Sequence, residues 1–437
     1  MLDIKYIREN VEKVKKAIKE KNVKVDLDKL LSLDKERKKI IGEVEDLNGE
    51  KNKLNEEIQK SENKKSVIKK GKVVKEKLEK LKPKMEEIEK EYKALLVQVP
   101  NVTSADMPIG KDESENKVIK KWGEIPNFNF EVKDHMQLGE ELDLIDVKKA
   151  SEVSGSRFYY LKNEAVFLQF ALVNFVFNTL SQEKILQEII EETEVKVSAK
   201  PFSPMLPPVM IKHEVQESIH RVFGEQTYRF EKDKLNLVAS AEHTLAPYHM
   251  NEVIDAEKLP LRYIGYSTAF RREAGTYGKD MGGILRVHQF DKLEMESFTD
   301  AETGVDEQKF IVGIQEYLVQ QLKIPYQLVH VCTGDTGKPD FDQFDIECWL
   351  PGQNKYRETH TSDYMTDYQT RGINSFYRNK SGEKKLLHTN DATAFAIGRI
   401  LIAILENYQQ VDGSVVVPEV LRKWMPGRME KISRTTD

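Results

Sequence analysis

Residues 270–298 contain the side chains best suited to chemistry, because charges interrupt what otherwise has the pattern of a buried hairpin. Among them are Arg271, Arg272, Glu273, Arg286, Asp291, Glu294 and Glu296. Charged groups are rarely buried without a partner or a ligand, and a guanidinium binds oxyanions bidentately. Two arginines on facing strands beside an acid therefore suit a polyphosphate. An exposed hairpin with surface ion pairs remains the alternative.

The elements expected around these charges are two strands joined by a glycine-rich loop. Apolar residues alternate loosely on the far side of the loop, at Leu285, Val287 and Phe290. Glycines suit the turn conformations between the strands, because they adopt positive φ angles without steric cost. These glycines are Gly275, Gly278, Gly282 and Gly283.

Length and composition limit the class of protein. The 437 residues, 39% hydrophobic and 32% charged, suffice for two or three domains with a sizeable core. No run approaches the ~18 apolar residues of a membrane helix, and the N-terminus does not resemble a signal peptide. Cys332 and Cys348 are the two cysteines, so we expect no disulfide framework, a reducing cytoplasmic location and no membrane partner. The histidine and cysteine spacing also argues against a structural zinc.

Heptad spacing predicts a long helical arm near the N-terminus. A short amphipathic helix is expected over residues 3–21 with Asp3 as its cap. Two apolar seams follow, over residues 30–58 and 74–95, separated by a polar stretch from Gln59 to Lys72. They predict an antiparallel coiled coil whose first helix is ~43 Å long, and Pro83 predicts a kink in the second helix.

The charge of this arm suggests a polyanionic partner. Residues 1–100 carry 28 Lys and Arg against 21 Asp and Glu, a net +7, whereas the remainder is net −12. Lysines along such an arm can contact nucleic-acid phosphates and release counterions. A dimerisation or spacer coiled coil is the alternative. Residues 101–128, with prolines, Gly110 and an acidic run, predict a linker to a second domain over 129–437.

The motif F-R-R-E-A-G, followed by R-V-H-Q-F-D-K-L-E, resembles the second signature motif of class II aminoacyl-tRNA synthetases. Its form is similar to that of the seryl-tRNA synthetase family, and the resemblance covers essentially the whole chain. It implies an α+β fold, with an antiparallel sheet flanked by helices and an N-terminal antiparallel coiled-coil arm. It also implies a ligase that forms seryl-adenylate from serine and ATP, then transfers the seryl group to tRNA(Ser).

The resemblance also implies roles for residues of the second motif. Arg271 contacts the α-phosphate and the substrate carboxylate, and Arg286 reaches the γ-phosphate. Glu273 bonds to the adenine, Phe290 stacks on it, and Glu294 meets the serine ammonium. Cations that stabilise a five-coordinate phosphorus are a physically reasonable catalytic device for this reaction.

Three further segments carry implied site residues. Ser240 and Glu242 lie in a segment that recognises serine, and Glu358 and Thr361 are implied ligands of Mg²⁺, which prefers hard oxygens. Residues 388–409 resemble the third motif, a strand feeding a buried helix. There Arg399 is implied to bind the γ-phosphate, and Asp391 and Thr393 to line the serine pocket. Asp391 replaces the usual asparagine, and an ionised aspartate can accept but not donate a hydrogen bond. Without the resemblance, a surface or structurally paired arginine is the better interpretation of Arg399.

The resemblance implies a homodimer, built through a first motif that comprises a helix over 165–182 and a strand ending at residues 207–210. The arm is then expected to read tRNA(Ser), and tRNA(Sec) stays open as a further substrate. Two rivals remain. One is a relative that adenylates an amino acid and loads a carrier protein; the other is a non-catalytic RNA-binding scaffold.

Overall fold

The computed structural model describes residues 1–60, 64–221, 224–274 and 282–434. The chain divides into two compact units, Met1–Val102 and Thr103–Asp437. Each unit has its own packing, and each is described separately below.

The first unit is entirely helical. Its helices are α1 (Ile4–Glu9), α2 (Val11–Glu20), α3 (Leu27–Lys60) and α4 (Lys64–Leu96). Asp3 caps α1 as expected, since its side chain accepts a hydrogen bond from the Lys5 amide at 2.5 Å. The single helix predicted over residues 3–21 is wrong, because Asn10 has non-helical angles (φ −131°, ψ 39°) that separate α1 from α2.

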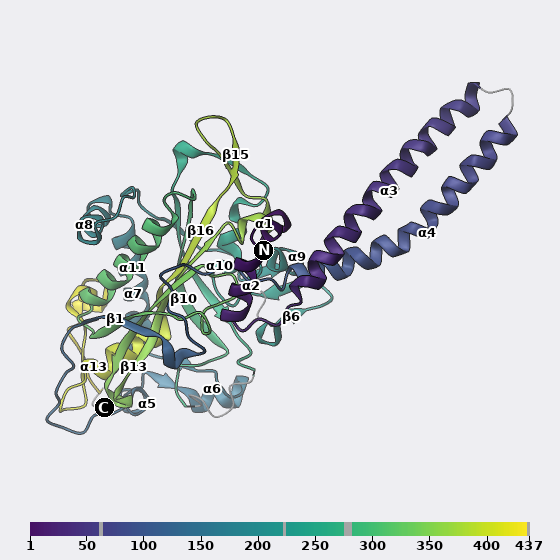
Figure 1. Ribbon diagram of the computed structural model, residues 1–437. Coiled ribbons are helices and arrows are strands. Elements are labelled where there is room, and N and C mark those ends of the chain that lie inside the picture. Colours follow the sequence, from purple (N-terminus) through teal and green to yellow (C-terminus); the bar gives the residue numbers. More distant parts are fainter. Residues whose placement is uncertain (61–63, 222–223, 275–281, 435–437) are drawn as a thin grey trace. The chain divides into compact units, whose positions relative to one another are not determined.

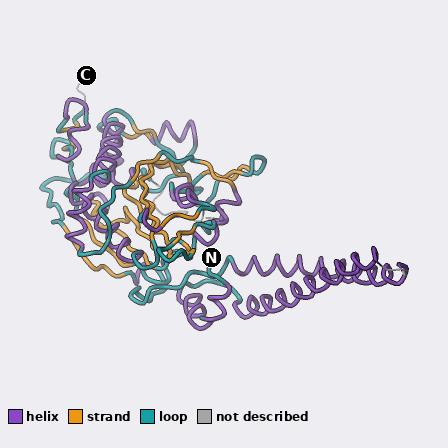
Figure 2. Tube along the Cα trace, turned by 90° about the horizontal axis from the view of Figure 1, so that it is seen from above, coloured by secondary structure: helices purple, strands orange, loops and turns teal. Residues whose placement is uncertain are grey.

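Helices α3 and α4 run antiparallel and side by side, as the heptads predicted (Figures 1 and 2). Leu54, Val67 and Val74 are buried between them. Arg37, which occupies a seam position, packs its guanidinium 5.0 Å from the centre of the Tyr92 ring and pairs with Glu89. A charged residue is thereby accommodated in an otherwise apolar seam.

One detail of the arm differs from the sequence pattern. The expected interruption from residue 59 to 72 is largely helical, because α4 already begins at Lys64. Pro83 lies within α4, and the kink expected there stays a prediction. Packing against the partner helix stabilises residues whose own polarity does not predict a helix. Helix α4 therefore extends beyond its apolar seam.

The second unit is built on an eight-stranded sheet. In spatial order its strands are β1 (Lys117–Trp122), β11 (Tyr326–His330), β12 (Asp342–Leu350), β13 (Lys355–Thr366), β16 (His388–Ala396), β10 (Gln289–Thr299), β9 (Leu261–Phe270) and β4 (Ser203–Met205). All neighbours are antiparallel except β4 and β9, which are parallel. The strand predicted at the start of residues 388–409 corresponds to β16.

Two segments differ from their expected conformations. Residues 117–122, within the expected linker, form edge strand β1 and pair with β11. The expected strand ending at residues 207–210 is wrong, because β4 ends at Met205 and Pro207 and Pro208 lie in the loop before β5. Proline lacks the amide hydrogen that a sheet ladder requires.

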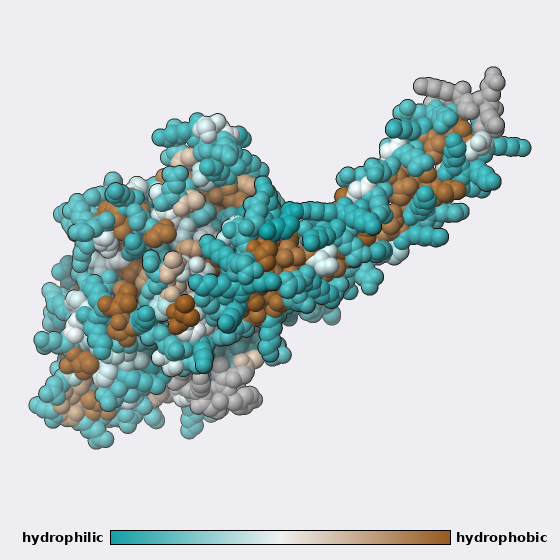
Figure 3. All heavy atoms as spheres, in the orientation of Figure 1, coloured by the Kyte–Doolittle hydropathy of each residue, from teal (hydrophilic) through white to brown (hydrophobic). Residues whose placement is uncertain are grey.

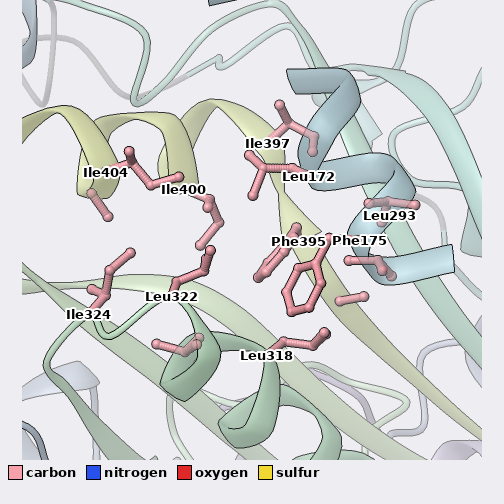
Figure 4. Close-up of a cluster of buried hydrophobic side chains, with 14 of the residues drawn as sticks. Leu172, Phe175, Leu293, Leu318, Leu322, Ile324, Phe395, Ile397, Ile400 and Ile404 are labelled. Atoms are coloured by element: carbon pink, nitrogen blue, oxygen red, sulfur yellow. The ribbon is translucent and has the colours of Figure 1, made fainter. Parts of the chain in front are cut away.

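Helices cover the sheet and bury its apolar face. They are α5 (His135–Glu141), α6 (Val147–Ser154), α7 (Glu164–Leu180), α8 (Glu183–Thr193), α9 (His213–Ser218), α10 (Glu242–Leu245), α11 (Gly304–Gln321), α12 (Thr370–Ile373) and α13 (Ile397–Asn407). Side chains of α7, α11 and α13 meet Leu293 of β10 and Phe395 of β16 in the core (Figure 4). The core therefore fixes the two strands that flank the candidate site.

Four small sheets complete the second unit. They are β2 (Ile145–Asp146) with β3 (Tyr160–Leu161); β5 (Met210–Lys212), β7 (Leu235–Leu237) and β6 (Arg229–Phe230); β8 (Val253–Asp255), β14 (Phe376–Arg378) and β15 (Lys384–Leu386); and β17 (Val415–Val416) with β18 (Lys431–Ile432).

The visible surface is mostly hydrophilic, with scattered apolar patches and a line of apolar residues along the arm (Figure 3). Among the described residues, no single helix is long and apolar enough to cross a membrane. Only α7 and α8 taken together have the length and apolar composition of a membrane span, and the chain bends by 76° between them.

Candidate active site

A cavity of about 400 Å³ opens on one face of the eight-stranded sheet. Every site residue expected from the sequence lines it: Ser240, Glu242, Arg271, Glu273, Arg286, Phe290, Glu294, Glu358, Thr361, Asp391, Thr393 and Arg399. The first and last of these are about 160 positions apart in the chain. Strands β9, β10, β13 and β16 bring them together.

Strand register explains the placement. Residues of β10 alternate between the two faces, so Phe290, Lys292 and Glu294 all point into the cavity. Glu294 lies opposite Thr393 on β16. The expectation that Arg271 and Arg286 lie on facing strands is wrong. Arg271 follows the end of β9 at Phe270, and Arg286 precedes the start of β10 at Gln289.

The cationic end of the cavity contains Arg271, Arg286 and Arg399. The Nε of Arg271 donates to the Ala239 carbonyl at 3.2 Å, and its guanidinium lies 5.3 Å from the centre of the Phe290 ring. Burial and the nearby Arg399 lower the pKa of Arg271. Cations crowded together in this way suit an anionic ligand, which relieves their mutual repulsion.

Two carboxylates hold the other arginines in place. Arg286 Nη1 bonds to Glu273 Oε2 at 3.0 Å, and Arg399 Nη1 bonds to Glu358 Oε1 at 2.9 Å. Burial opposes ionisation of Glu358, but Arg399 and Arg271 outweigh it and hold the pKa of that carboxyl below its ordinary value. Glu358 is therefore an anion available for a cationic ligand.

The opposite end of the cavity is acidic. Lys292 pairs with Glu294 at 2.5 Å and donates to Thr393 Oγ1 at 3.5 Å. Burial raises the pKa of Glu294, and Lys292 offsets that effect only in part. Ser240 Oγ accepts from the Glu242 amide at 3.2 Å, which orients that hydroxyl beside the Glu242 carboxylate. This end therefore offers small polar groups and carboxylates to an ammonium-bearing ligand.

Arg221 joins four carboxylates at the floor of the acidic end. Its Nε donates to Glu242 at 2.7 Å, and its Nη2 lies 2.9 Å from Asp363, 3.2 Å from Asp340 and 3.3 Å from both oxygens of Asp391. Burial works against the charge of Arg221, but these acids outweigh it and raise its pKa well above the ordinary value. Burial and Glu242 raise the pKa of Asp391, and Arg221 offsets this in part.

Comparisons with known proteins agree with this geometry. A family model described as "Seryl-tRNA synthetase N-terminal domain" matches residues 1–103, and "tRNA synthetase class II core domain (G, H, P, S and T)" matches residues 227–408. The serine–tRNA ligase of Dictyoglomus turgidum is 41% identical over 433 residues, which cover 97% of this chain and 98% of the relative. The chain belongs to the seryl-tRNA synthetase family. The expected family is thus confirmed.

Solved structures support the same conclusion for the fold. Seryl-tRNA synthetase from Pyrococcus horikoshii, complexed with ATP, has a TM-score of 0.85 and 35% identity over 100% of both chains. The cytoplasmic enzyme of Naegleria fowleri, in complex with AMP, has a TM-score of 0.81 and 27% identity, over 100% of this chain and 99% of that one. The expected α+β class is confirmed. As a member of the seryl-tRNA synthetase family, the chain is a serine–tRNA ligase that uses ATP.

Sequence reasoning missed several residues of this synthetase pocket. Lys292 could have been found, because strand alternation places it on the same face as Phe290 and Glu294. Arg221 had no such signal, since it lies outside every motif. Asp340 also lines the cavity without belonging to a motif, whereas Asp363 lies two positions after Thr361 on β13, so strand alternation could have found it.

The glycine-rich loop is described only in part. Gly275 and Gly278 lie outside the described residues. Gly283 has a positive φ of 83°, as expected for a turn, and a side chain there would collide with His135 Nε2 at 2.2 Å. Gly282 has open space around it. Leu285 and Val287 line the cavity beside Phe290.

One pair of oxygen donors in this pocket suits a metal ion. Within the described ranges, no group of three or more His, Cys, Asp or Glu is arranged to hold a metal ion. Glu358 and Thr361 both line the cavity, and a carboxylate with a hydroxyl fits Mg²⁺, which keeps several waters and uses substrate phosphate oxygens for the rest. The donor set therefore fits a magnesium ion that arrives with ATP.

Proposed function

We propose that this pocket activates serine by bringing its carboxylate to the α-phosphate of ATP, with Arg271 between the two anions. The observation that carries the proposal is the division of one cavity into a cationic end, with Arg271, Arg286 and Arg399, and an acidic end, with Glu242 and Glu294. Triphosphate suits the first end, and an ammonium suits the second. An amino acid and ATP thereby meet near Arg271.

The chemical step requires little from the protein beyond positioning and charge. A carboxylate oxygen of serine attacks the α-phosphorus, and the bond from that phosphorus to the bridging oxygen breaks, so pyrophosphate leaves with the electron pair. Arg271 stabilises the charge that develops on the five-coordinate phosphorus. Arg286 and Arg399 hold the departing phosphates, while Glu273 and Phe290 hold the adenine. The seryl group then passes to the 3′ end of tRNA.

Binding of serine falls to residues of the acidic end. Glu294 receives the ammonium, and Ser240, Glu242, Asp391 and Thr393 surround the side chain. Glu358 and Thr361 hold Mg²⁺, which when bound neutralises phosphate charge. The Glu358 carboxylate is supported in this role by its lowered pKa, because an ionised oxygen is the required ligand.

A homodimer is supported by apolar side chains exposed on the first-motif elements. Phe167 and Phe170 of α7 are 47% and 50% exposed, and Leu206, beside edge strand β4, is 79% exposed. Exposed large apolar side chains and an edge strand are each typical of an interface. Sedimentation of the chain and of a Phe167→Ser/Phe170→Ser variant tests this: the unchanged chain should be dimeric, and the variant should dissociate.

The arm formed by α3 and α4 is proposed to bind tRNA(Ser), and tRNA(Sec) where that tRNA is present. Its lysines support this role, since Lys51, Lys53, Lys65, Lys69 and Lys72 are all exposed and can lie against phosphates. We also propose functional domains over residues 1–100 and 129–437 joined by 101–128. A cytoplasmic location fits the two cysteines, which are buried and free.

ATP–pyrophosphate exchange tests the proposal, with serine, threonine, alanine and glycine compared. Exchange with serine is expected, and Arg271→Ala should reduce it by at least about 10³-fold. Arg272→Ala is a matched control, because this neighbouring arginine is exposed and does not line the cavity. Normal exchange in folded Arg271→Ala protein would refute the assigned role. Absence of exchange in the unchanged chain would instead favour the non-catalytic rival.

A further inference from the structure

Three buried carboxyl groups form a row across adjacent strands beneath the serine pocket. Glu296 of β10 lies opposite Asp391 of β16, and Asp391 lies opposite Asp363 of β13. All three are at most 5% exposed. Ionised carboxylates directly opposite each other on a sheet destabilise it, so any charge that this row carries requires a compensating cation. Arg221 is the cation in contact with it.

The Arg221 side chain is fixed from several directions. Gln216 Nε2 donates to the Arg221 carbonyl at 3.4 Å, which helps to anchor the backbone. Glu242, which accepts from Nε of Arg221, also accepts from Gln369 Nε2 at 2.7 Å. The guanidinium is therefore held by groups from α10, β13 and β16 and cannot turn freely. A positioned donor loses little conformational entropy when a ligand binds.

One edge of this guanidinium remains available to a ligand. Its bonds to Glu242, Asp363 and Asp391 use Nε and Nη2, and Nη1 has no hydrogen-bond partner among the residues that the structure describes. Arg221 itself lines the cavity together with Asp391. Gly337 lines the cavity as well, and a side chain at that position would come within 3.4 Å of Nη1 and 2.1 Å of Asp340 Oδ2. Glycine thus leaves space beside Nη1.

A hydroxyl group both donates and accepts hydrogen bonds, so full recognition needs an acceptor and a donor. Asp391, when ionised, supplies only the acceptor. We propose that Arg221 supplies the missing donor: its Nη1 donates to the side-chain oxygen of bound serine, whose hydroxyl proton is accepted by Asp391. Arg221 and Asp391 thus act together as a specificity-determining pair. This inference rests on the proposed function of the same pocket.

A substrate without the hydroxyl leaves this pair partly unsatisfied, which disfavours its binding. Arg221→Lys tests the contact, because lysine keeps a positive charge beside the carboxylates but lacks the planar fork that carries Nη1. In ATP–pyrophosphate exchange, the KM for serine should rise roughly tenfold to a hundredfold. The KM for ATP should change by less than about threefold, since Arg221 is assigned to the amino-acid end alone.

Alanine separates a contact with the hydroxyl from a general disturbance of the pocket. Its inhibition constant against serine-dependent exchange should be nearly unchanged in Arg221→Lys, because alanine has no side-chain oxygen. Equal weakening of serine and alanine would overturn the proposal and assign Arg221 a purely structural role. Equal weakening of serine and alanine is also expected if a protonated Asp391 carboxyl, rather than Arg221, donates a hydrogen bond to the serine side chain.

A double variant provides a rescue test. Arg221→Lys/Asp391→Asn places an amide, which both donates and accepts, where the ionised carboxylate only accepts. It should recover most of the serine affinity lost in Arg221→Lys, and failure to recover any would overturn the proposal. The matched control is Arg272→Lys, which makes the same substitution at an arginine that does not line the cavity. Circular dichroism verifies that each variant folds. If the unchanged chain shows no exchange with serine, both this inference and the proposed function fail; a normal serine KM in Arg221→Lys refutes the inference alone.

Discussion

The Glu307→Gln substitution should destabilise the second unit by removing the partner of a fully buried arginine. Arg262, in the strand that leads to Arg271, bonds to both oxygens of Glu307 at 2.6 and 2.7 Å, and both side chains are 0% exposed. Arg262 Nη1 also donates to the carbonyls of Ser198 and Lys200 at 2.6 and 2.8 Å. Glutamine retains the shape of glutamate but leaves the guanidinium charge uncompensated.

The expected loss follows from this burial. Removing one partner of a buried ion pair costs about 3–5 kcal/mol. The unit from Thr103 to Asp437 contains about 335 residues, and at ~2.1 cal/mol/K per residue its unfolding entropy is about 0.7 kcal/mol/K. The melting temperature of this unit should therefore fall by about 4–7 °C.

Differential scanning calorimetry measures the shift, with Glu152→Gln as the matched control. Glu152 pairs with Lys149 on an exposed helix surface, so its loss should cost less than about 0.5 kcal/mol. Arg262→Met/Glu307→Leu replaces the whole pair with apolar groups and should be more stable than Glu307→Gln, because no unpaired charge remains. A shift below about 1 °C for Glu307→Gln, or a less stable double variant, would refute the reasoning.

Three further predictions concern acid stability, metal dependence and the arm. Burial lowers the pKa of His243 from 6.5 to about 4, so the folded state loses up to about 3 kcal/mol as pH falls from 6.5 to 4; His243→Gln should flatten that part of a stability–pH curve, and an unchanged slope would contradict the assignment. Glu358→Gln should lower exchange by about 10²-fold and raise the Mg²⁺ concentration needed for half-maximal activity, and an unaltered magnesium titration would exclude Glu358 as a ligand. Leu54→Ala empties a buried position between Val67 and Val74 and should cost the arm about 2–5 kcal/mol. Faster amide exchange in the arm and weaker tRNA charging are then expected with normal ATP–pyrophosphate exchange, whereas unchanged amide exchange would refute the packing argument.

Local patterns in the sequence were sufficient for the elements whose stabilising contacts are close in the chain. The heptads predicted α3 and α4 because a coiled coil repeats one contact along its length. The strand and helix of residues 388–409, which correspond to β16 and α13, were predicted from the family resemblance instead. Twelve residues that line the cavity were also predicted, but the roles proposed for them come from resemblance to the seryl-tRNA synthetase family rather than from the spacing of charges.

Tertiary structure decided what depends on segments that are distant in sequence. Strand β1 forms because β11 supplies its hydrogen-bond partners, although its own residues read as a linker. The strands beside the phosphate end stop before Arg271 and start after Arg286, so both arginines lie outside the paired strands, although the Arg271 amide still donates to the His288 carbonyl at 3.0 Å.

Arg221 is the clearest case of this dependence. Its partners Glu242, Asp363 and Asp391 come from three elements, and the distance from position 221 to position 391 in the chain is 170 residues. A lone arginine has no period or motif that identifies it, because the free energy that fixes its position comes from burial and charge pairing. Those quantities exist only once the sheet has assembled.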